Sequence, residues 1–337
     1  MMSLVDAPTV AGSLGLEGAV AAWVDSLSPV SPEAGGIDLP SPDRAEALLA
    51  ALGVDPEDAL EVVDTLPSPA STPEIWWMLT RCHRLLCDAL GRIDEPRGWW
   101  PRLPASLGAR GGCFYAHLFL AMIPDTLGWH QAHGVPEDIS WDTFSDLSRH
   151  MRIHRQKYGT VGVDEPWWMT LHLRGEVYEC GRLQFDMHRL GKGEIAWDLR
   201  EPGMTIGDEA IGVHIPEAGP MTEELCDRSF GIARELFPRA FPGSERRVAT
   251  CTSWLLDDQL LEYLPTTSNI SRFQSRFNLL PTAVDDDEGV LGFVFHRPGE
   301  VMPVLDTLPQ ETALQRALVA HIRSGRHWRV RTGWLEL

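Results

Sequence analysis

The sequence lacks the marks of secreted, membrane-spanning and disulfide-stapled proteins. Its six cysteines are scattered, without CxxC spacing: Cys82, Cys87, Cys113, Cys180, Cys226 and Cys251. No stretch approaches the roughly 18 uninterrupted apolar residues of a membrane span. No N-terminal segment joins basic residues to an apolar run, as a secretory signal does. We therefore expect a cytoplasmic protein with reduced cysteines and no membrane partner.

Positive charge is also scarce. The 337 residues include 48 acidic and 29 basic side chains, giving a net charge of −19, and only two lysines, Lys157 and Lys192. An acidic surface repels nucleic acid at long range, so no nucleic-acid partner is expected. Two local basic patches, at residues 149–157 and 323–331, could still receive a small anion. Apolar residues at 44% and 13 tryptophans exclude disorder, and the length predicts two domains.

Metal ligands are sparse in the sequence. His83 and Cys87 share one helix face at a spacing of four residues, next to Cys82, but no second ligand pair lies nearby. His150 and His154 have the same spacing without an accompanying carboxylate. We therefore expect these cysteines to be small buried side chains, and we expect no metal.

The first half of the chain predicts helices. Ser41-Pro42, Asp55-Pro56 and Thr72-Pro73 each place a capping residue before proline at a first helical position. Residues 113–123 are apolar on most faces and predict a central helix that Pro124 ends. Residues 136–158 predict one helix crossing between the two halves, with basic residues crowded at its end. Trp99-Trp100 is interpreted as a packed lid and not as a binding platform.

The second half predicts a mixed α/β domain, so the fold class is α+β. Predicted strands are residues 167–174 and 176–187, forming a hairpin at Arg174-Gly175-Glu176, then 195–199, 210–215, 247–253, 290–296 and an edge strand at 328–331. Predicted helices are residues 222–237, stopped by Pro238, then 255–264, 269–278 and a last helix that a capping box at 307–310 opens. The predicted domains are 1–134 and 135–337.

The most informative segment is a strand, a loop and a helix at residues 210–237. The strand feeds a short Pro/Gly loop, and Thr222 opens the helix that follows. Backbone N–H groups at a helix N-terminus have no helical partner and point toward one place, which suits an anion such as phosphate. The alternative is a plain βα turn in which Thr222 is only a cap.

Several blocks resemble those of a little-studied bacterial family. They are Val213-His214-Ile215-Pro216-Glu217, Cys251 to Asp257, Glu262-Tyr263-Leu264-Pro265, Ser268-Asn269-Ile270 and Arg272-Phe273-Gln274. Members of that family join a helical N-acyltransferase N-terminal domain to a GNAT-like C-terminal domain. The resemblance covers nearly the whole chain. It implies an acyl-CoA-dependent N-acyltransferase that uses acyl-CoA or CoA as co-substrate and a small-molecule amine as acceptor.

The resemblance also implies a cofactor site. The strand with Val213 and Ile215 would pair with the pantetheine amides, and the following loop would wrap the diphosphate. The implied cofactor-binding residues are Val213, Ile215, Glu217, Ala218, Gly219, Met221, Thr222 and Asn269. This loop departs from the usual Gln/Arg-x-x-Gly-x-Gly/Ala pattern, because it has one glycine, a carboxylate and no basic residue.

Acyl transfer needs a base for the amine and an acid for the departing thiolate. The resemblance implies that a tyrosine supplies the acid, and Tyr263 is the candidate. Cys251 and Ser253, two apart on one strand, could contact the acyl group or simply pack. The candidate bases are Glu176 and Glu217, with His214 third. The alternative function is a non-catalytic small-molecule or acyl-binding protein that retains the fold.

Overall fold

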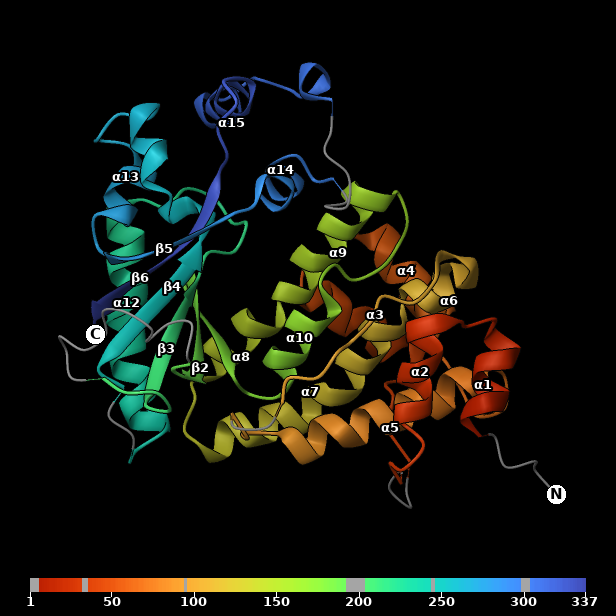
Figure 1. The fold of residues 1–337 in the computed structure, drawn as a ribbon. Helices are drawn as coiled ribbons and strands as arrows, with labels where there is room; N and C mark the ends of the chain where they lie inside the picture. The colour runs from red at the N-terminus through yellow and green to blue at the C-terminus, as the bar shows by residue number, and fades with distance from the viewer. Residues whose placement is uncertain (1–5, 32–35, 94–95, 192–203, 244–245, 298–303) are drawn as a thin grey trace. The chain divides into compact units, whose positions relative to one another are not determined.

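The computed structural model describes residues 6–31, 36–93, 96–191, 204–243, 246–297 and 304–337. The chain divides into two compact units, Met1–Val177 and Tyr178–Leu337 (Figure 1). This division lies well after residue 134, where the sequence predicted it, because the helices between residues 137 and 173 belong to the first unit. Among the described residues, no helix has both the length and the apolar character that crossing a membrane requires.

The first unit is helical, as predicted. Its elements are α1 (Ala7–Leu14), α2 (Gly18–Ser26), α3 (Pro42–Ala51), α4 (Pro56–Asp64), α5 (Pro73–Ala89), η1 (Ala105–Leu107), α6 (Gly108–Gly112), α7 (Phe114–Ala132), α8 (Glu137–Phe144), α9 (Asp146–Tyr158) and α10 (Pro166–Leu173). Helix α7 supplies the centre of the core and packs against α5 and α10. Its residues from Phe114 to Ile123 are all buried, so its position is set by apolar burial on every side.

Proline acts differently at helix starts and inside helices. Helices α3, α4 and α5 begin at Pro42, Pro56 and Pro73, as predicted, although none of the preceding residues makes a side-chain cap. The fixed φ of proline suits a first helical turn. Pro124, however, lies inside α7 and does not end it. Packing retains the helix past the missing hydrogen bond, and Thr126 Oγ1 donates to the Leu173 carbonyl at 2.8 Å.

Two further local predictions for this unit were wrong. The single helix predicted at 136–158 is two helices, α8 and α9, separated by Ser145. The strand predicted at 167–174 is helix α10, which begins at Pro166. Its bulky apolar side chains suit a strand or a buried helix equally well, so the pattern could not decide between them.

Within its described residues, the second unit contains a six-stranded sheet in the order β1-β2-β3-β4-β6-β5. The strands are β1 (Val177–Cys180), β2 (Leu183–Arg189), β3 (Glu209–His214), β4 (Val248–Ser253), β5 (Asn278–Asp285) and β6 (Arg329–Glu336). Strands β3 and β4 are parallel, whereas the pairs β2–β3, β4–β6 and β5–β6 are antiparallel. The hairpin expected at residue 175 instead turns at Gly181-Arg182, where Gly181 adopts a φ of 78°.

Helix α12 (Glu223–Ala240) packs on one face of this sheet. Phe185 of β2 meets Phe230 of α12 edge to face, with ring centroids 5.6 Å apart, and Tyr178 meets Phe237 at 5.8 Å. Thr222 caps the helix as predicted, but Pro238 lies inside it and the helix continues to Ala240. Because side chains alternate across a strand, Phe185 sends its neighbours Gln184 and Asp186 to the opposite face.

The C-terminal third of the chain departs most from the prediction. The strand predicted at 290–296 is wrong, because its first five residues end helix α14 (Asp287–Val294). The helix predicted at 255–264 is replaced by two 3₁₀ helices, η2 (Trp254–Leu256) and η3 (Asp258–Glu262). Helix α13 (Asn269–Gln274) is shorter than predicted and is followed by the unpredicted β5. The predicted edge strand is β6, which lies between β4 and β5. The strand predicted at 195–199 lies outside the described residues.

The last helix begins later than predicted. Thr307 lies in a short 3₁₀ helix, η4 (Leu305–Thr307), and the capping box is formed by Thr312 and Gln315 at the start of α15 (Ala313–Arg323). Helices α14 and α15 pack around Trp328, which is fully buried. Its Nε1 donates to the Leu318 carbonyl at 3.1 Å, and its ring stacks on His321 with centroids 4.0 Å apart.

We expect Trp328→Ala to lower the free energy of unfolding of the second unit by about 3–5 kcal/mol, because it opens a large cavity in a closed cluster. Urea denaturation followed by circular dichroism measures this change. Phe293→Ala, at a half-exposed position on α14, is the control and should cost far less. Equal losses in the two variants would contradict the central role of Trp328.

Candidate functional site

The centre of the site is a buried carboxylate paired with a histidine. Asp186 of β2 is 2% exposed, and its Oδ1 lies 3.0 Å from Nε2 of His214 on β3. The two strands are antiparallel, with Gln184 opposite His214 and Asp186 opposite Gly212. Both side chains therefore project from the sheet face that α12 does not cover. His214 was the third candidate base from the sequence, and Asp186 was missed.

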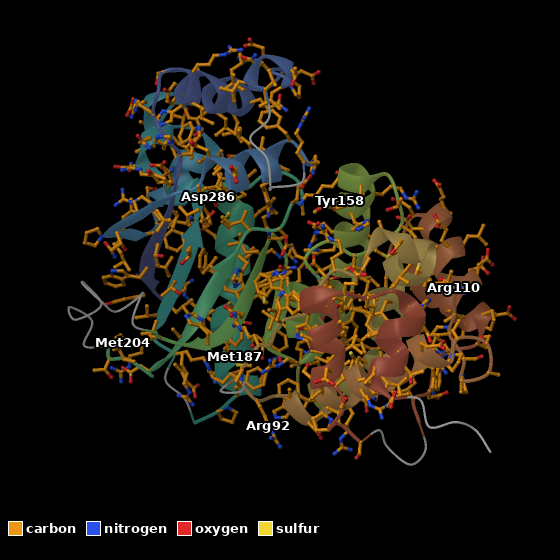
Figure 2. The ribbon with its side chains drawn as sticks, turned by 45° about the vertical axis from the view of Figure 1, so that its right-hand side comes forward. Arg92, Arg110, Tyr158, Met187, Met204 and Asp286 are labelled. Atoms are coloured by element: carbon orange, nitrogen blue, oxygen red, sulfur yellow. The ribbon has the colours of Figure 1, made fainter. Side chains whose placement is uncertain are left out.

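A second histidine and a threonine extend this polar row across three strands. His188 Nδ1 lies 3.5 Å from Asp186 Oδ1, and its Nε2 lies 3.3 Å from Thr250 Oγ1 on β4. Met187, labelled in Figure 2, separates Asp186 from His188 along β2. Because Asp186, His188 and Thr250 occupy the same face, the row reaches the parallel β3–β4 pair.

The carboxylate is held ionised. Burial opposes ionisation of Asp186, but the neighbouring His214 and His188 outweigh it and hold the pKa of Asp186 well below its usual range. An ionised carboxylate accepts a hydrogen bond from Nε2–H of His214, which leaves the lone pair of that imidazole on Nδ1. The pair is thereby arranged as a general base with a fixed tautomer.

Gly212 makes the room that this pair needs. A Cβ atom at position 212 would lie 1.7 Å from Asp186 Oδ1 and 3.1 Å from His214 Nε2. No side chain larger than hydrogen fits there without moving the carboxylate. The glycine in Ile211-Gly212-Val213 is therefore a requirement of the site, although its backbone lies in an ordinary strand.

The edge of β3 leads from this row to the loop. The register of β3 with β4 comprises Ile211 opposite Ala249 and Gly212 opposite Thr250, whereas β4 continues to pair with β6 as far as Ser253. Beyond Gly212 the backbone of Val213 thus passes the end of the described β3–β4 pairing. An extended ligand with amide groups can add to a strand edge at such a place.

Arg182 holds the loop that follows β3. Its guanidinium donates to the carbonyls of Pro216 at 3.0 Å, Gly219 at 3.2 Å and Pro220 at 3.3 Å. Gly219 has a φ of 55°, which favours glycine. The loop itself has no basic residue, and Arg182, in the turn between β1 and β2, supplies the missing positive charge. The sequence does not reveal this contact, because Arg182 lies 34 residues before Pro216.

Other residues of the predicted cofactor site have varied environments. Thr222 Oγ1 accepts from the Leu225 N–H at 3.3 Å, as an N-cap does, and Met221 is buried. Glu217 Oε1 lies 3.3 Å from Nε2 of His296. Among the other implied cofactor-binding residues, Ile215 and Ala218 are half-buried. Asn269, the first residue of α13, is exposed.

Known proteins share this architecture. Residues 43–175 match an N-acyltransferase N-terminal domain, and residues 177–335 match a GNAT-like C-terminal domain. An acyltransferase solved in complex with decanoyl-CoA and teicoplanin is 38% identical, with a TM-score of 0.90 over 99% of this chain and 100% of that one. The chain belongs to this acyltransferase family. A variant of an acyltransferase with octanoyl-CoA is 37% identical, with a TM-score of 0.89 over the same shares of both chains. No curated protein sequence matches significantly.

In this acyltransferase, the other candidate catalytic residues of the second unit lie outside the Asp186–His214 pair and make separate contacts. Cys251 is buried, and burial raises the pKa of its thiol to about 12, which disfavours a nucleophilic thiolate. Ser253 Oγ accepts from the Leu255 N–H at 3.1 Å and caps η2. Tyr263 contributes its hydroxyl to His321 Nδ1 at 3.1 Å, within the cluster around Trp328.

Glu176 belongs to the helical unit. It is buried and pairs with Arg174 at 2.8 Å and with Arg97 at 3.3 Å. Glu176 therefore forms a buried ion pair with two arginines, and this pairing is the role that the geometry gives it.

The two basic patches of the acyltransferase are paired with carboxylates. Arg155 pairs with Asp58 and Glu61, and Lys157 lies 2.8 Å from Asp164. In the second patch, Arg326 pairs with Glu262. Arg329 pairs with Asp257 and Asp258, and Arg331 also pairs with Asp258. These charges stabilise the two units internally and are poorly placed to receive a separate anion.

We expect Gly212→Ala to separate Asp186 from His214, because the added methyl group occupies the position of the carboxylate. Acyl transfer should fall at least tenfold, as for a base that has lost its orienting partner. Gly231→Ala on α12 is the matched control, because nothing lies within 4 Å of the added Cβ. Full activity of Gly212→Ala would show that the Asp186–His214 contact is not needed.

Proposed function

We propose that this chain is an acyl-CoA-dependent N-acyltransferase that moves an aliphatic acyl group from CoA to an amine of a small-molecule acceptor. The observation that carries the proposal is the Asp186–His214 pair beside the parallel β3–β4 strands. Similarity over 99% of the chain to acyltransferases solved with decanoyl-CoA and octanoyl-CoA supports acyl-CoA as the donor.

In the proposed reaction, the neutral acceptor amine attacks the thioester carbonyl, and His214 removes a proton from the nitrogen as the C–N bond forms and the nitrogen becomes cationic. The C–S bond then breaks as the tetrahedral intermediate collapses to the amide. The proton held by His214 then returns to the departing CoA thiolate. Asp186 stabilises the imidazolium between these two steps, since it is buried, ionised and 3.0 Å from the ring.

The donor site of the proposal combines the β3 edge with the loop. The pantetheine amides would pair along Val213, and the diphosphate would lie over the loop that Arg182 holds and over the N-terminus of α12.

The helical unit contains a hollow of its own with an aromatic lining. This cavity of about 670 Å³ is lined by Trp23, Leu27, Leu86, Trp99 and Trp100, and also by arginines. Trp100 is buried, as the lid interpretation expects, but Trp99 is 55% exposed and free to stack on a ring. One relative was solved with teicoplanin, a glycopeptide, so we infer a glycopeptide-like amine acceptor here.

We expect His214→Ala and Asp186→Asn each to lower kcat about 10²–10⁴-fold with little change in acyl-CoA affinity. Steady-state kinetics with decanoyl-CoA and a glycopeptide amine measures both parameters. Tyr263→Phe is the comparison, because it removes the other candidate proton donor and leaves the imidazole pair intact. If Tyr263→Phe greatly lowered kcat and His214→Ala did not, the proton donor and acceptor would be the tyrosine and not the histidine.

We also expect Arg182→Ala to weaken acyl-CoA binding by at least tenfold, because the loop loses its anchor and the site loses a positive charge. Binding should weaken as salt rises. Calorimetry with decanoyl-CoA measures both effects, and Arg234→Ala, at an exposed position on α12, is the control. If CoA and decanoyl-CoA fail to bind at millimolar concentration, the alternative of a non-catalytic binding protein is favoured.

A further inference from the structure

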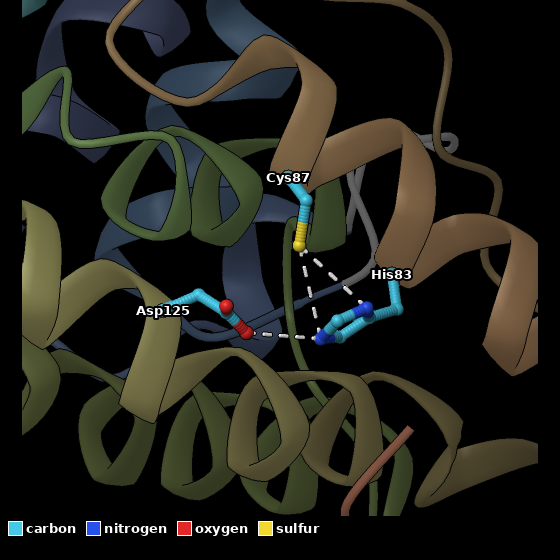
Figure 3. A group of neighbouring side chains, drawn as sticks. All are labelled: His83, Cys87 and Asp125. Carbon is cyan, nitrogen blue, oxygen red and sulfur yellow. Dashed lines mark hydrogen bonds and ion pairs between the residues drawn. The ribbon is translucent and has the colours of Figure 1, made fainter. Parts of the chain in front are cut away.

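Three side chains of different chemistry converge between two helices of the first unit. His83 and Cys87 lie one turn apart on α5, and Asp125 follows Pro124 on α7, which packs against α5. Figure 3 shows the three side chains facing one another, with contacts from the imidazole to both the thiol and the carboxylate. His83 Nε2 lies 3.1 Å from Asp125 Oδ2, and Cys87 Sγ lies 3.6 Å from Nδ1 and 3.8 Å from Nε2 of His83.

The two separations from Nε2 suit donors around one tetrahedral ion, whereas the short distance from Cys87 Sγ to Nδ1 requires the imidazole to rotate when an ion binds. Zinc binds nitrogen and oxygen at about 2.0–2.2 Å and thiolate sulfur at about 2.3 Å, so tetrahedral angles place N and O about 3.3 Å apart and N and S about 3.6 Å apart. The corresponding distances to Nε2 are 3.1 and 3.8 Å. The three ligand atoms all lie within 4.8 Å of one another. The Asp125 side chain is 46% exposed and so has room to close the remaining distance.

We propose that His83, Cys87 and Asp125 bind a divalent cation of the zinc class, with water in the fourth position. A thiolate and an imidazole select a borderline-soft ion, whereas the carboxylate favours zinc over copper(I). Nε2 of His83 is the ligating nitrogen because it lies 3.1 Å from Asp125 Oδ2 and 3.8 Å from Cys87 Sγ. The thiol of Cys87 loses its proton on binding. Exposure of Asp125 leaves a path for the ion and its water.

Cys82 is excluded from the donor set. It lies on α5 next to His83, but it is fully buried, and burial raises the pKa of its thiol. The set also could not be found from spacing, because Asp125 is 42 residues beyond His83. Only the packing of α7 on α5 provides the third ligand that the sequence lacked.

An ion at this place would tie α5 to α7 where α7 is weakest. Pro124 removes one backbone hydrogen bond from α7, and Asp125 is the next residue. A bond from that turn to two residues of α5 therefore restrains the two central helices. Because this site is independent of the proposed acyl transfer, its test uses metal binding and stability and no activity measurement.

The test is a titration of the chelator-treated full chain with cobalt(II), then zinc(II). We expect one cobalt per chain, a thiolate-to-cobalt absorption band in the near ultraviolet, and loss of the band as zinc displaces cobalt. Cys87→Ala should abolish the band, and His83→Ala and Asp125→Asn should weaken cobalt binding at least tenfold. Cys82→Ala is the matched control and should keep the band.

Thermal unfolding provides the second readout. Zinc should raise the Tm of the wild type and of Cys82→Ala in a concentration-dependent manner, but not that of Cys87→Ala, because ligands stabilise only the state that they bind. Circular dichroism verifies that each variant is folded. Absence of a cobalt band at millimolar cobalt, or a band that persists in Cys87→Ala, would overturn the proposal.

Discussion

The hydrogen bond between Asp186 and His214 constrains the sheet of the second unit. A buried carboxylate is tolerated only with partners, and here they come from the same strand and from the next one. This requirement fixes the β2–β3 register, since a shift by one residue would send Asp186 into the aromatic contact with Phe230. It also fixes glycine at position 212. Stability and proposed chemistry therefore depend on the same atoms.

Local signals predicted the parts of the fold that local physics decides. The helix starts at Pro42, Pro56 and Pro73, the Thr222 cap and the strands β3 and β4 all follow from neighbouring residues. Pro124 and Pro238 were misjudged because tertiary burial outweighs the cost of one lost hydrogen bond. The position of β6 was misjudged because strand order depends on pairing between segments far apart in the sequence, which periodicity does not record.

The candidate site was predictable in outline and not in detail. The strand–loop–helix segment and His214 stood out because they are contiguous, and the resemblance assigned them a role. Asp186, Arg182 and Asp125 were missed because each acts across 28 or more residues: 28 from Asp186 to His214, 34 from Arg182 to Pro216, and 42 from His83 to Asp125. Glu176 and Cys251 were candidates because of their residue type alone. The structure argues against both, because Glu176 is buried in an ion pair and Cys251 is buried and its thiol has a raised pKa.

The place of β6 has a consequence for how the chain assembles. Strand β5 joins the sheet only through β6, and β6 is the final strand in the sequence. During synthesis, residues 278–285 therefore emerge with no strand to pair with until residues 329–336 follow. The sheet is completed when β6 inserts between β4 and β5. This step has a high contact order, because it pairs segments that are far apart in the sequence. Unpaired edges of this kind invite pairing with other chains, so recombinant yield should depend on how fast the C-terminal segment docks.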